Sequence, residues 1–199
     1  MFDDIPAQKI SAFHDVKLNL PRWAKDMPAE FSQGVWKFIE LNHRFNNLLW
    51  DEEDLARRKN VPDSEIAANK RAIDGYNQAR NDAIENIDDL LLQRLADVKQ
   101  NPDAWLNSET AGSIIDRLSI ISLKIFHMQL QTQRQDVGQD HVNTCQQKLE
   151  RLTEQRSDLQ FCLDTLLSHA PEGRAYFKIY RQFKMYNDPS LNPWLYHTK

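Results

Sequence analysis

Polar and charged residues recur at steps of three and four along two predicted helices, a spacing that places them on one face of each helix. On the first helix they are His43, Asn46, Trp50, Glu53 and Arg57, and on the second Lys70, Asp74, Asn77 and Asn81. Arg and Lys can hold phosphate, while Asp and Asn can exchange hydrogen bonds with sugar hydroxyls. An antiparallel hairpin about Val61–Pro62 would bring the two stripes together as one polar seam. A solvated flank with weak ion pairs explains the same pattern equally well.

A third predicted helix carries charge on an otherwise apolar surface. Its polar residues include Asp116, Arg117, Lys124 and His127. A helix that is apolar nearly all round is buried, and buried charge is costly unless it is paired. These side chains should therefore meet partners or line a wet pocket, unless they lie at the helix rim with their stems extended outward. We predict that this is the most buried long helix, and a second, exposed apolar face on it would indicate a homo-oligomer.

Aromatic residues alternate with cations near the end of the chain, where Arg181 and Lys184 are candidate ligand-binding residues. Such a pattern can bind anionic ligands, although the aromatics of a folded protein more often anchor a core while the cations face water. We predict that at least two of Arg57, Asp74 and Asp116 border one pocket together with Arg181 or Lys184.

Established metal and cofactor motifs do not account for these residues. Glu40 and His43 form one Glu-x-x-His pair, but a di-iron bundle needs a second pair and two further glutamates. Glu53 and Glu85 resemble the acidic clusters of helical pyrophosphohydrolases, yet the hairpin would offset them by roughly 18 Å. The sequence contains no zinc spacing and no glycine-rich phosphate loop. We therefore predict no metal site and assign no cofactor.

Composition favours a helical protein with an ordinary core. Of 199 residues, 41% are hydrophobic and only five are glycine, too few for the tight turns of a β-rich fold. The net charge of −4 gives no footprint for nucleic-acid binding. The acidic N-terminus does not resemble a secretory signal, and no stretch approaches the ~20 apolar residues of a membrane span. Two cysteines in helical segments favour a reducing compartment, so we expect a cytoplasmic protein.

Apolar periodicity and helix-breaking residues predict four long helices. They span about residues 28–59, 65–100, 109–135 and 140–169, and Pro, Gly and Asn mark the breaks between them. Residues 1–28 read as an irregular lead-in with one short helix, a short aromatic helix follows Gly173, and residues 187–199 form an extended tail. We predict a single all-α domain over residues 1–199, folded as an up-and-down bundle.

Four segments resemble a bacterial family known only as a domain of unknown function. They cover residues 43–57, 70–82, 114–120 and 180–189. The resemblance implies an all-helical fold and an association with genes for cell-surface glycan synthesis, and it implies no reaction. Members of the family usually carry a proline where this chain has Ala111, which predicts a looser start of the third helix here.

Two functional hypotheses follow. The first is a non-catalytic helical protein that binds a protein partner or an anionic, sugar-like ligand in bacterial cell-surface glycan assembly. The alternative is a Mg²⁺-dependent enzyme acting on a phosphorylated or nucleotide-linked sugar, with Glu53, Asp74 and Asp116 as metal ligands or as acid and base. A concave pocket reached by the polar stripes favours the enzyme, whereas a flat, dry seam favours the binding protein.

Overall fold

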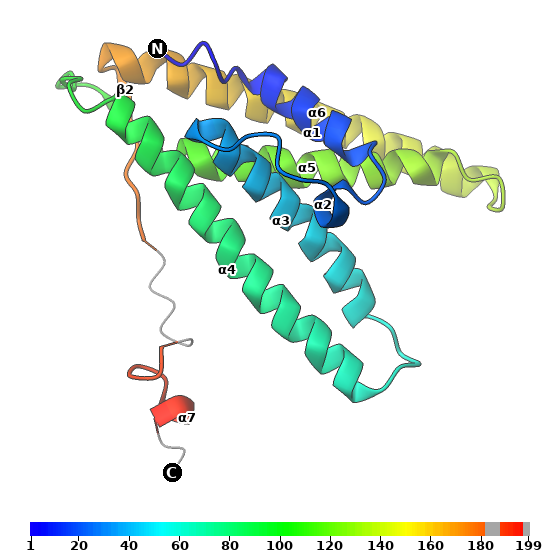
Figure 1. The fold of residues 1–199 in the computed structure, drawn as a ribbon. Helices are drawn as coiled ribbons and strands as arrows, with labels where there is room; N and C mark the ends of the chain where they lie inside the picture. The colour runs from blue at the N-terminus through cyan, green and yellow to red at the C-terminus, as the bar shows by residue number, and fades with distance from the viewer. Residues whose placement is uncertain (182–187, 197–199) are drawn as a thin grey trace.

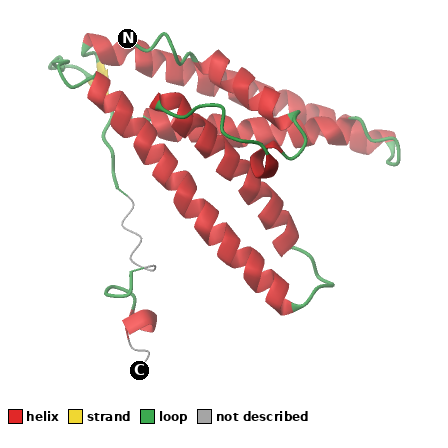
Figure 2. Cartoon of the chain, viewed as in Figure 1, coloured by secondary structure: helices red, strands yellow, loops and turns green. Residues whose placement is uncertain are grey.

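The computed structural model describes residues 1–181 and 188–196, and over these residues the protein is almost entirely helical. The long helices are α3 (Gly34–Ala56), α4 (Asp63–Arg94), α5 (Ala111–Thr132) and α6 (Gln139–His169). Shorter elements are α1 (Ala7–Leu18), α2 (Trp23–Asp26), α7 (Pro193–Tyr196) and the 3₁₀ helix η1 (Ala170–Glu172). Two-residue strands β1 (Trp105–Leu106) and β2 (Ala175–Tyr176) form a minimal parallel ladder (Figure 2). The predicted all-α class is confirmed.

The four long helices form two antiparallel hairpins, α3 with α4 and α5 with α6. The hairpins pack across one another, close together near the C-terminal ends of α4 and α6 and diverging toward their turns (Figure 1). Every predicted long helix exists, but the bundle is splayed instead of parallel. No helix among the described residues is both long enough and apolar enough to cross a membrane.

Helix α5 is the centre of the core. Eleven of its 22 residues are buried, against eight of 23 in α3, six of 32 in α4 and five of 31 in α6. Its side chains Ile115 and Leu118 are completely buried. The prediction that this is the most buried long helix is confirmed.

The short helix predicted within residues 1–28 is present as α1, but this N-terminal segment packs into the core and is not the irregular lead-in that was predicted. Ile5, Ile10 and His14 are completely buried, because α1 packs against both α5 and α6. Residues 28–33 are not helical, so α3 starts later than predicted. Here the backbone amides of Glu30 and Phe31 donate to the carboxylate of Glu40 at 2.9 and 3.0 Å, which fixes the loop to α3.

The segment after α4 is also not helical to its predicted end. The amide of Asn101 donates to the carbonyl of Gly173 at 2.9 Å, and β1 pairs with β2 immediately beyond it. These bonds hold the α4–α5 connection against the end of α6. Residues 175–181 accordingly form a strand and extended chain where an aromatic helix was predicted, and the rest of that predicted helix lies outside the described residues.

The start of α5 is firmly capped, so the looser start predicted at Ala111 is wrong. Thr110 Oγ1 accepts a hydrogen bond from the amide of Ser113 at 3.1 Å, and Asp88 Oδ1 accepts one from the amide of Gly112 at 2.7 Å. Ala111 itself is completely buried. Two of the amides that a helix start leaves unpaired are thus satisfied without a proline.

Candidate functional site

Trp50 of α3 and His127 of α5 stack face to face where the two hairpins begin to diverge. Their ring centroids lie 4.4 Å apart and the rings are within 5° of parallel. A cavity opens on each side of Trp50, and Trp50 and Asp54 line both. We call the larger one the cleft and the smaller one the side pocket.

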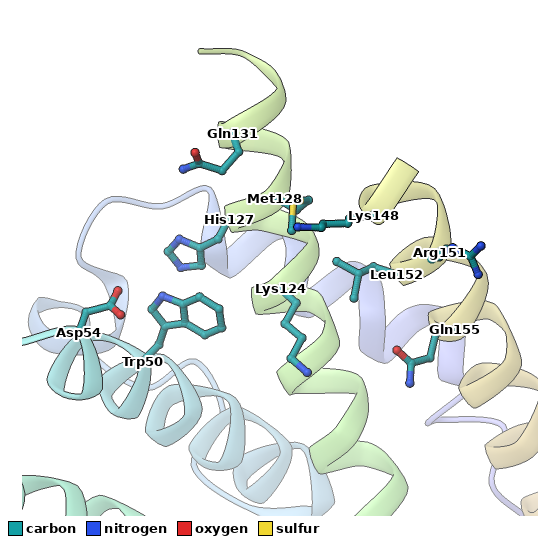
Figure 3. A pocket seen from close by; sticks show the side chains of 10 residues that line it. All are labelled: Trp50, Asp54, Lys124, His127, Met128, Gln131, Lys148, Arg151, Leu152 and Gln155. Atoms are coloured by element: carbon teal, nitrogen blue, oxygen red, sulfur yellow. The ribbon is translucent and has the colours of Figure 1, made fainter. Parts of the chain in front are cut away.

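The cleft has a volume of about 610 Å³ and lies between α3, α5 and α6 (Figure 3). Its lining residues are Trp50, Asp54, Lys124, His127, Met128, Gln131, Lys148, Arg151, Leu152 and Gln155. In Figure 3, Leu152 and Lys148 project from α6 toward α5, whereas Arg151 lies at the outer rim. A cavity of this size with apolar walls and a few polar groups has the usual properties of a small-ligand site.

Positive charge dominates the cleft. Within the described chain, Lys124, Lys148 and Arg151 form no ion pair with another residue. The acidic lining residue, Asp54, already receives a contact from Arg57 at 3.4 Å. Lys124 and Lys148 therefore offer a ligand in the cleft two cations without an acidic partner, and Arg151 adds a third at the outer rim, which favours an anion.

The pKa of His127 is shifted mainly by the partial burial of its imidazole. Burial lowers its pKa below the ordinary value, because the charged form loses hydration. Asp54 and Asp51 act in the opposite direction, with smaller effect. His127 is therefore neutral at neutral pH, where it presents one donor and one acceptor beside the indole of Trp50.

The side pocket has a volume of about 290 Å³ and lies between α3, α4 and α5. It is lined by Asn46, Leu49, Trp50, Glu53, Asp54, Arg57, Arg80, Ile120 and Leu123. Apolar residues from α3 and α5 form part of its wall, and the charged residues come from α3 and α4.

A buried polar cluster lies behind the side pocket and is centred on Asp116. Asp116 Oδ1 accepts hydrogen bonds from the side-chain amides of Asn42 and Asn46, both at 2.8 Å. Arg80 Nε lies 3.9 Å from the same oxygen. Asn46 also donates to Ser119 Oγ at 3.0 Å. The aspartate on the apolar helix is thus held by two hydrogen-bond donors from α3 and lies beside the guanidinium group of Arg80 on α4.

His43 is a core residue and borders neither cavity. It is completely buried, with Nδ1 hydrogen-bonded to Ser119 Oγ at 2.7 Å and Nε2 to the carbonyl of His14 at 3.2 Å. Its ring stacks between the rings of His14 and Trp23. Burial lowers its pKa to about 3, so the imidazole is neutral.

The predicted polar seam between α3 and α4 is wrong, although the antiparallel hairpin itself is present. His43 and Asn46 point toward α1 and α5, and Lys70 and Asp74 are exposed on α4. Asn77 is only half-buried. The hairpin is instead joined by a hydrogen bond from Asn69 to Glu52 at 2.7 Å and by the stacked rings of Phe45 and Tyr76. Pairing with Asp116 and Ser119 rotates the polar face of α3 toward α5.

The other predicted residues fall in separate places. Asn81 borders a small cavity of about 80 Å³ beside Asp88 and Tyr180. Arg117 pairs with Glu109 at 2.5 Å on the surface. Arg181 binds Glu85 and Asp89 of α4 and lines neither cavity, and Lys184 lies outside the described residues.

The described residues do not form the predicted pocket that joins at least two of Arg57, Asp74 and Asp116 with Arg181, and the alternative partner Lys184 lies outside them. Glu53 and Arg57 line the side pocket, and they also form an ion pair with each other at 3.3 Å. Asp116 is linked to that pocket through Asn46 and Arg80. Asp74 is absent from the lining of both cavities.

Sequence reasoning included Lys124 and His127 but missed Arg80, Lys148 and Arg151. Lys148, Arg151 and Leu152 follow helical spacing on α6 and look like the ordinary polar flank of an amphipathic helix. Only the packing of α6 beside α5 and α3 shows that these two cations border a cavity and have no acidic partner.

Among the described residues, no group of three or more His, Cys, Asp or Glu side chains is arranged to hold a metal ion. The three carboxylates of the enzyme hypothesis are dispersed. Glu53 lines the side pocket, Asp116 is buried behind it, and Asp74 is exposed on α4.

The fold and the two cavities beside Trp50 define an all-α protein with a cationic cleft between crossed helical hairpins. The family model described as "Protein of unknown function (DUF4254)" matches residues 36–179, so the chain belongs to this family. No curated protein and no solved structure matches the chain. Three of the segments that carry the family resemblance, residues 43–57, 70–82 and 114–120, each contribute lining residues to the side pocket.

Proposed function

We propose that this protein is a non-catalytic binding protein of bacterial cell-surface glycan assembly, and that its cleft holds an anionic, sugar-like ligand. The observation that carries the proposal is the unpaired charge of Lys124 and Lys148 in the cleft that contains the stacked rings of Trp50 and His127, with Arg151 at its outer rim. An anion in this position would form charge-assisted hydrogen bonds with cations that no described protein group neutralises.

The remaining walls suit the uncharged part of such a ligand. Met128 and Leu152 provide apolar contact, and the half-buried Trp50 offers an aromatic surface. Phosphorylated and nucleotide-linked sugars combine an anionic group with a larger uncharged moiety. The association with glycan synthesis rests on the family resemblance. Cys145 and Cys162 are both free thiols, which supports a reducing compartment such as the cytoplasm.

The second candidate is a Mg²⁺-dependent enzyme acting on the same class of sugar. It is favoured by one observation, that residues of the α3 polar stripe reach a concave pocket, as Asn46, Glu53 and Arg57 do. The dispersal of Glu53, Asp74 and Asp116 counts against it, because the carboxylates proposed to hold Mg²⁺ would have to converge. Binding without chemistry is therefore the better-supported proposal.

A thermal-shift screen tests the proposal. Sugar phosphates, nucleoside diphosphates and nucleotide sugars are added with and without Mg²⁺, and the matching uncharged sugars serve as controls. A ligand present at 100 times its Kd stabilises the folded protein by about 2.7 kcal/mol, which raises Tm by several degrees. We expect anionic probes to raise Tm without Mg²⁺. A Tm unchanged by every anionic probe would contradict the proposal, and turnover that requires Mg²⁺ would favour the enzyme.

A further inference from the structure

The side pocket contains hydrogen-bonding groups that no described residue satisfies. Arg80 Nε is shielded from solvent yet has no hydrogen-bond partner. Its one ion-pair contact among the described residues is Asp116 Oδ1 at 3.9 Å, which is too long for a hydrogen bond. A guanidinium has five donors, and a buried donor without an acceptor destabilises the folded protein.

Asn46 supplies the complementary acceptor. Its amide nitrogen donates to Asp116 at 2.8 Å and to Ser119 at 3.0 Å, which fixes the orientation of the side chain. Its amide oxygen receives no hydrogen bond from the described residues, and Asn46 lines the side pocket. One unused acceptor and one set of unused donors therefore border the same small cavity.

The charges around the side pocket favour a neutral ligand. Two carboxylates, Glu53 and Asp54, and two guanidinium groups, Arg57 and Arg80, line it, so the lining carries no net charge. Asp116 lies directly behind Arg80 and adds one negative charge. A phosphate would be repelled by these three carboxylates, whereas a hydroxyl can accept from Arg80 and donate to Asn46 at no electrostatic cost.

We propose that the side pocket binds a neutral, hydroxyl-rich ring of the pyranose type. Arg80 donates to the ring hydroxyls, Asn46 Oδ1 accepts from them, and Leu49, Ile120 and Leu123 contact the apolar face of the ring. Asp116 is a positioning residue, because it acts by orienting Asn46 and Arg80. Trp50 and Asp54 line both cavities, so one ligand can place its ring here and its anionic group in the cleft. Only the placement of one ligand across both cavities rests on the proposed function.

Saturation-transfer difference NMR with uncharged methyl glycosides tests the side pocket by itself. The probes are the methyl glycosides of glucose, galactose, mannose and N-acetylglucosamine. We expect transfer to at least one of them in the unmodified protein and at least about tenfold weaker binding in Arg80→Gln, since the charge-assisted hydrogen bonds to the ring hydroxyls are lost. Arg71→Gln is the matched control, because Arg71 is an exposed arginine of α4 outside both cavities.

Arg80→Lys provides a second variant in which the charge beside Asp116 is retained. It loses the planar fork of donors, so we expect weaker glycoside binding with Tm unchanged. Absence of transfer to all four glycosides, or equal binding by Arg80→Gln and Arg71→Gln, would overturn the proposal. The two proposals fail separately. Arg80-dependent glycoside binding without any thermal shift by anionic probes contradicts only the cleft, and the reverse result contradicts only the side pocket.

Discussion

Asp116 shows how one charged residue is accommodated in the core of this protein. It is 9% exposed, and its carboxylate accepts from Asn42 and Asn46 while lying near Arg80. Its removal would leave two buried amides without their acceptor and Arg80 without its counter-charge. Asp74, an equally prominent carboxylate in the sequence, is exposed on α4 and has none of these contacts.

We therefore expect Asp116→Ala to lower the free energy of unfolding by about 3 kcal/mol, as observed when one partner of a buried polar network is removed. Asp74→Ala, the matched control, should change it by less than about 0.5 kcal/mol. Urea denaturation of both variants measures the difference. Similar stabilities of the two variants would show that the Asp116 cluster does not hold α3 to α5.

His14 and His43 are completely buried, stacked with ring centroids 4.2 Å apart. Burial lowers the pKa of His43 to about 3, and it lowers that of His14 well below the ordinary value. In the unfolded chain both imidazoles take up a proton near pH 6.5, whereas in the folded protein they stay neutral at that pH. Stability should therefore fall as the pH drops below about 6.5, by up to about 1.4 kcal/mol per pH unit for each histidine.

The carboxyl group of Asp88 partly offsets this loss of stability at low pH. Burial raises its pKa to about 6, so its protonation favours the folded state between about pH 6 and pH 4. We expect a net fall in the free energy of unfolding from pH 7 to pH 5, with a smaller slope in His43→Gln than in the unmodified protein. Urea titrations at several pH values measure these slopes. Equal slopes for His43→Gln and the unmodified protein would contradict the lowered pKa of His43 in the folded protein.

At the scale of helices, the contact between α4 and α5 depends on a glycine. A Cβ added at Gly112 would lie 2.7 Å from the carbonyl oxygen of Ile84 and 2.8 Å from Asp88 Oδ1. The Gly112 amide also donates to that aspartate oxygen, so the two helices meet backbone to backbone at this point. Gly75, in the middle of α4, has nothing within 4 Å of such a Cβ.

Alanine at these two glycines should have opposite effects. Gly112→Ala forces α5 away from α4 and should destabilise the protein by about 1–3 kcal/mol. Gly75→Ala should stabilise it by about 0.5–1 kcal/mol, because alanine has the higher helix propensity. Thermal unfolding of both variants is the measurement. A stable Gly112→Ala protein would mean that the helices are less closely packed than described.

The sequence predicts the helices better than it predicts the faces they present. Apolar periodicity identified all four long helices, and the break at Pro62 identified the α3–α4 hairpin. Charge on an apolar helix correctly indicated that Asp116 needs partners. The identity of those partners depends on how α3 is rotated about its axis, which is set by contacts with α5 and not by the spacing within α3. The burial of the short N-terminal helix was not predicted for the same reason, since its few apolar residues become core residues only by packing on α5.

For the whole molecule, the divergence of the two hairpins is what creates the candidate site. If the helices were parallel throughout, the space between α3 and α6 would be filled by side chains such as Trp50, His127 and Leu152. The crossing instead leaves a cavity of about 610 Å³ whose cations come from α5 and α6. The anion binding that we propose for the cleft therefore depends on cations that are distant in sequence and have no acidic partner among the described residues.

Isothermal titration of the anionic probe with the largest thermal shift tests this claim most directly. It compares a cleft variant, Lys124→Gln with Lys148→Gln, with a control of the same net charge, Lys59→Gln with Lys70→Gln, whose lysines are exposed and line neither cavity. We predict at least about tenfold weaker binding for the cleft variant, from the loss of two charge-assisted contacts, and near-normal binding for the control. Equal weakening of binding in both variants would show that the anion responds only to overall charge, and it would contradict binding in the cleft.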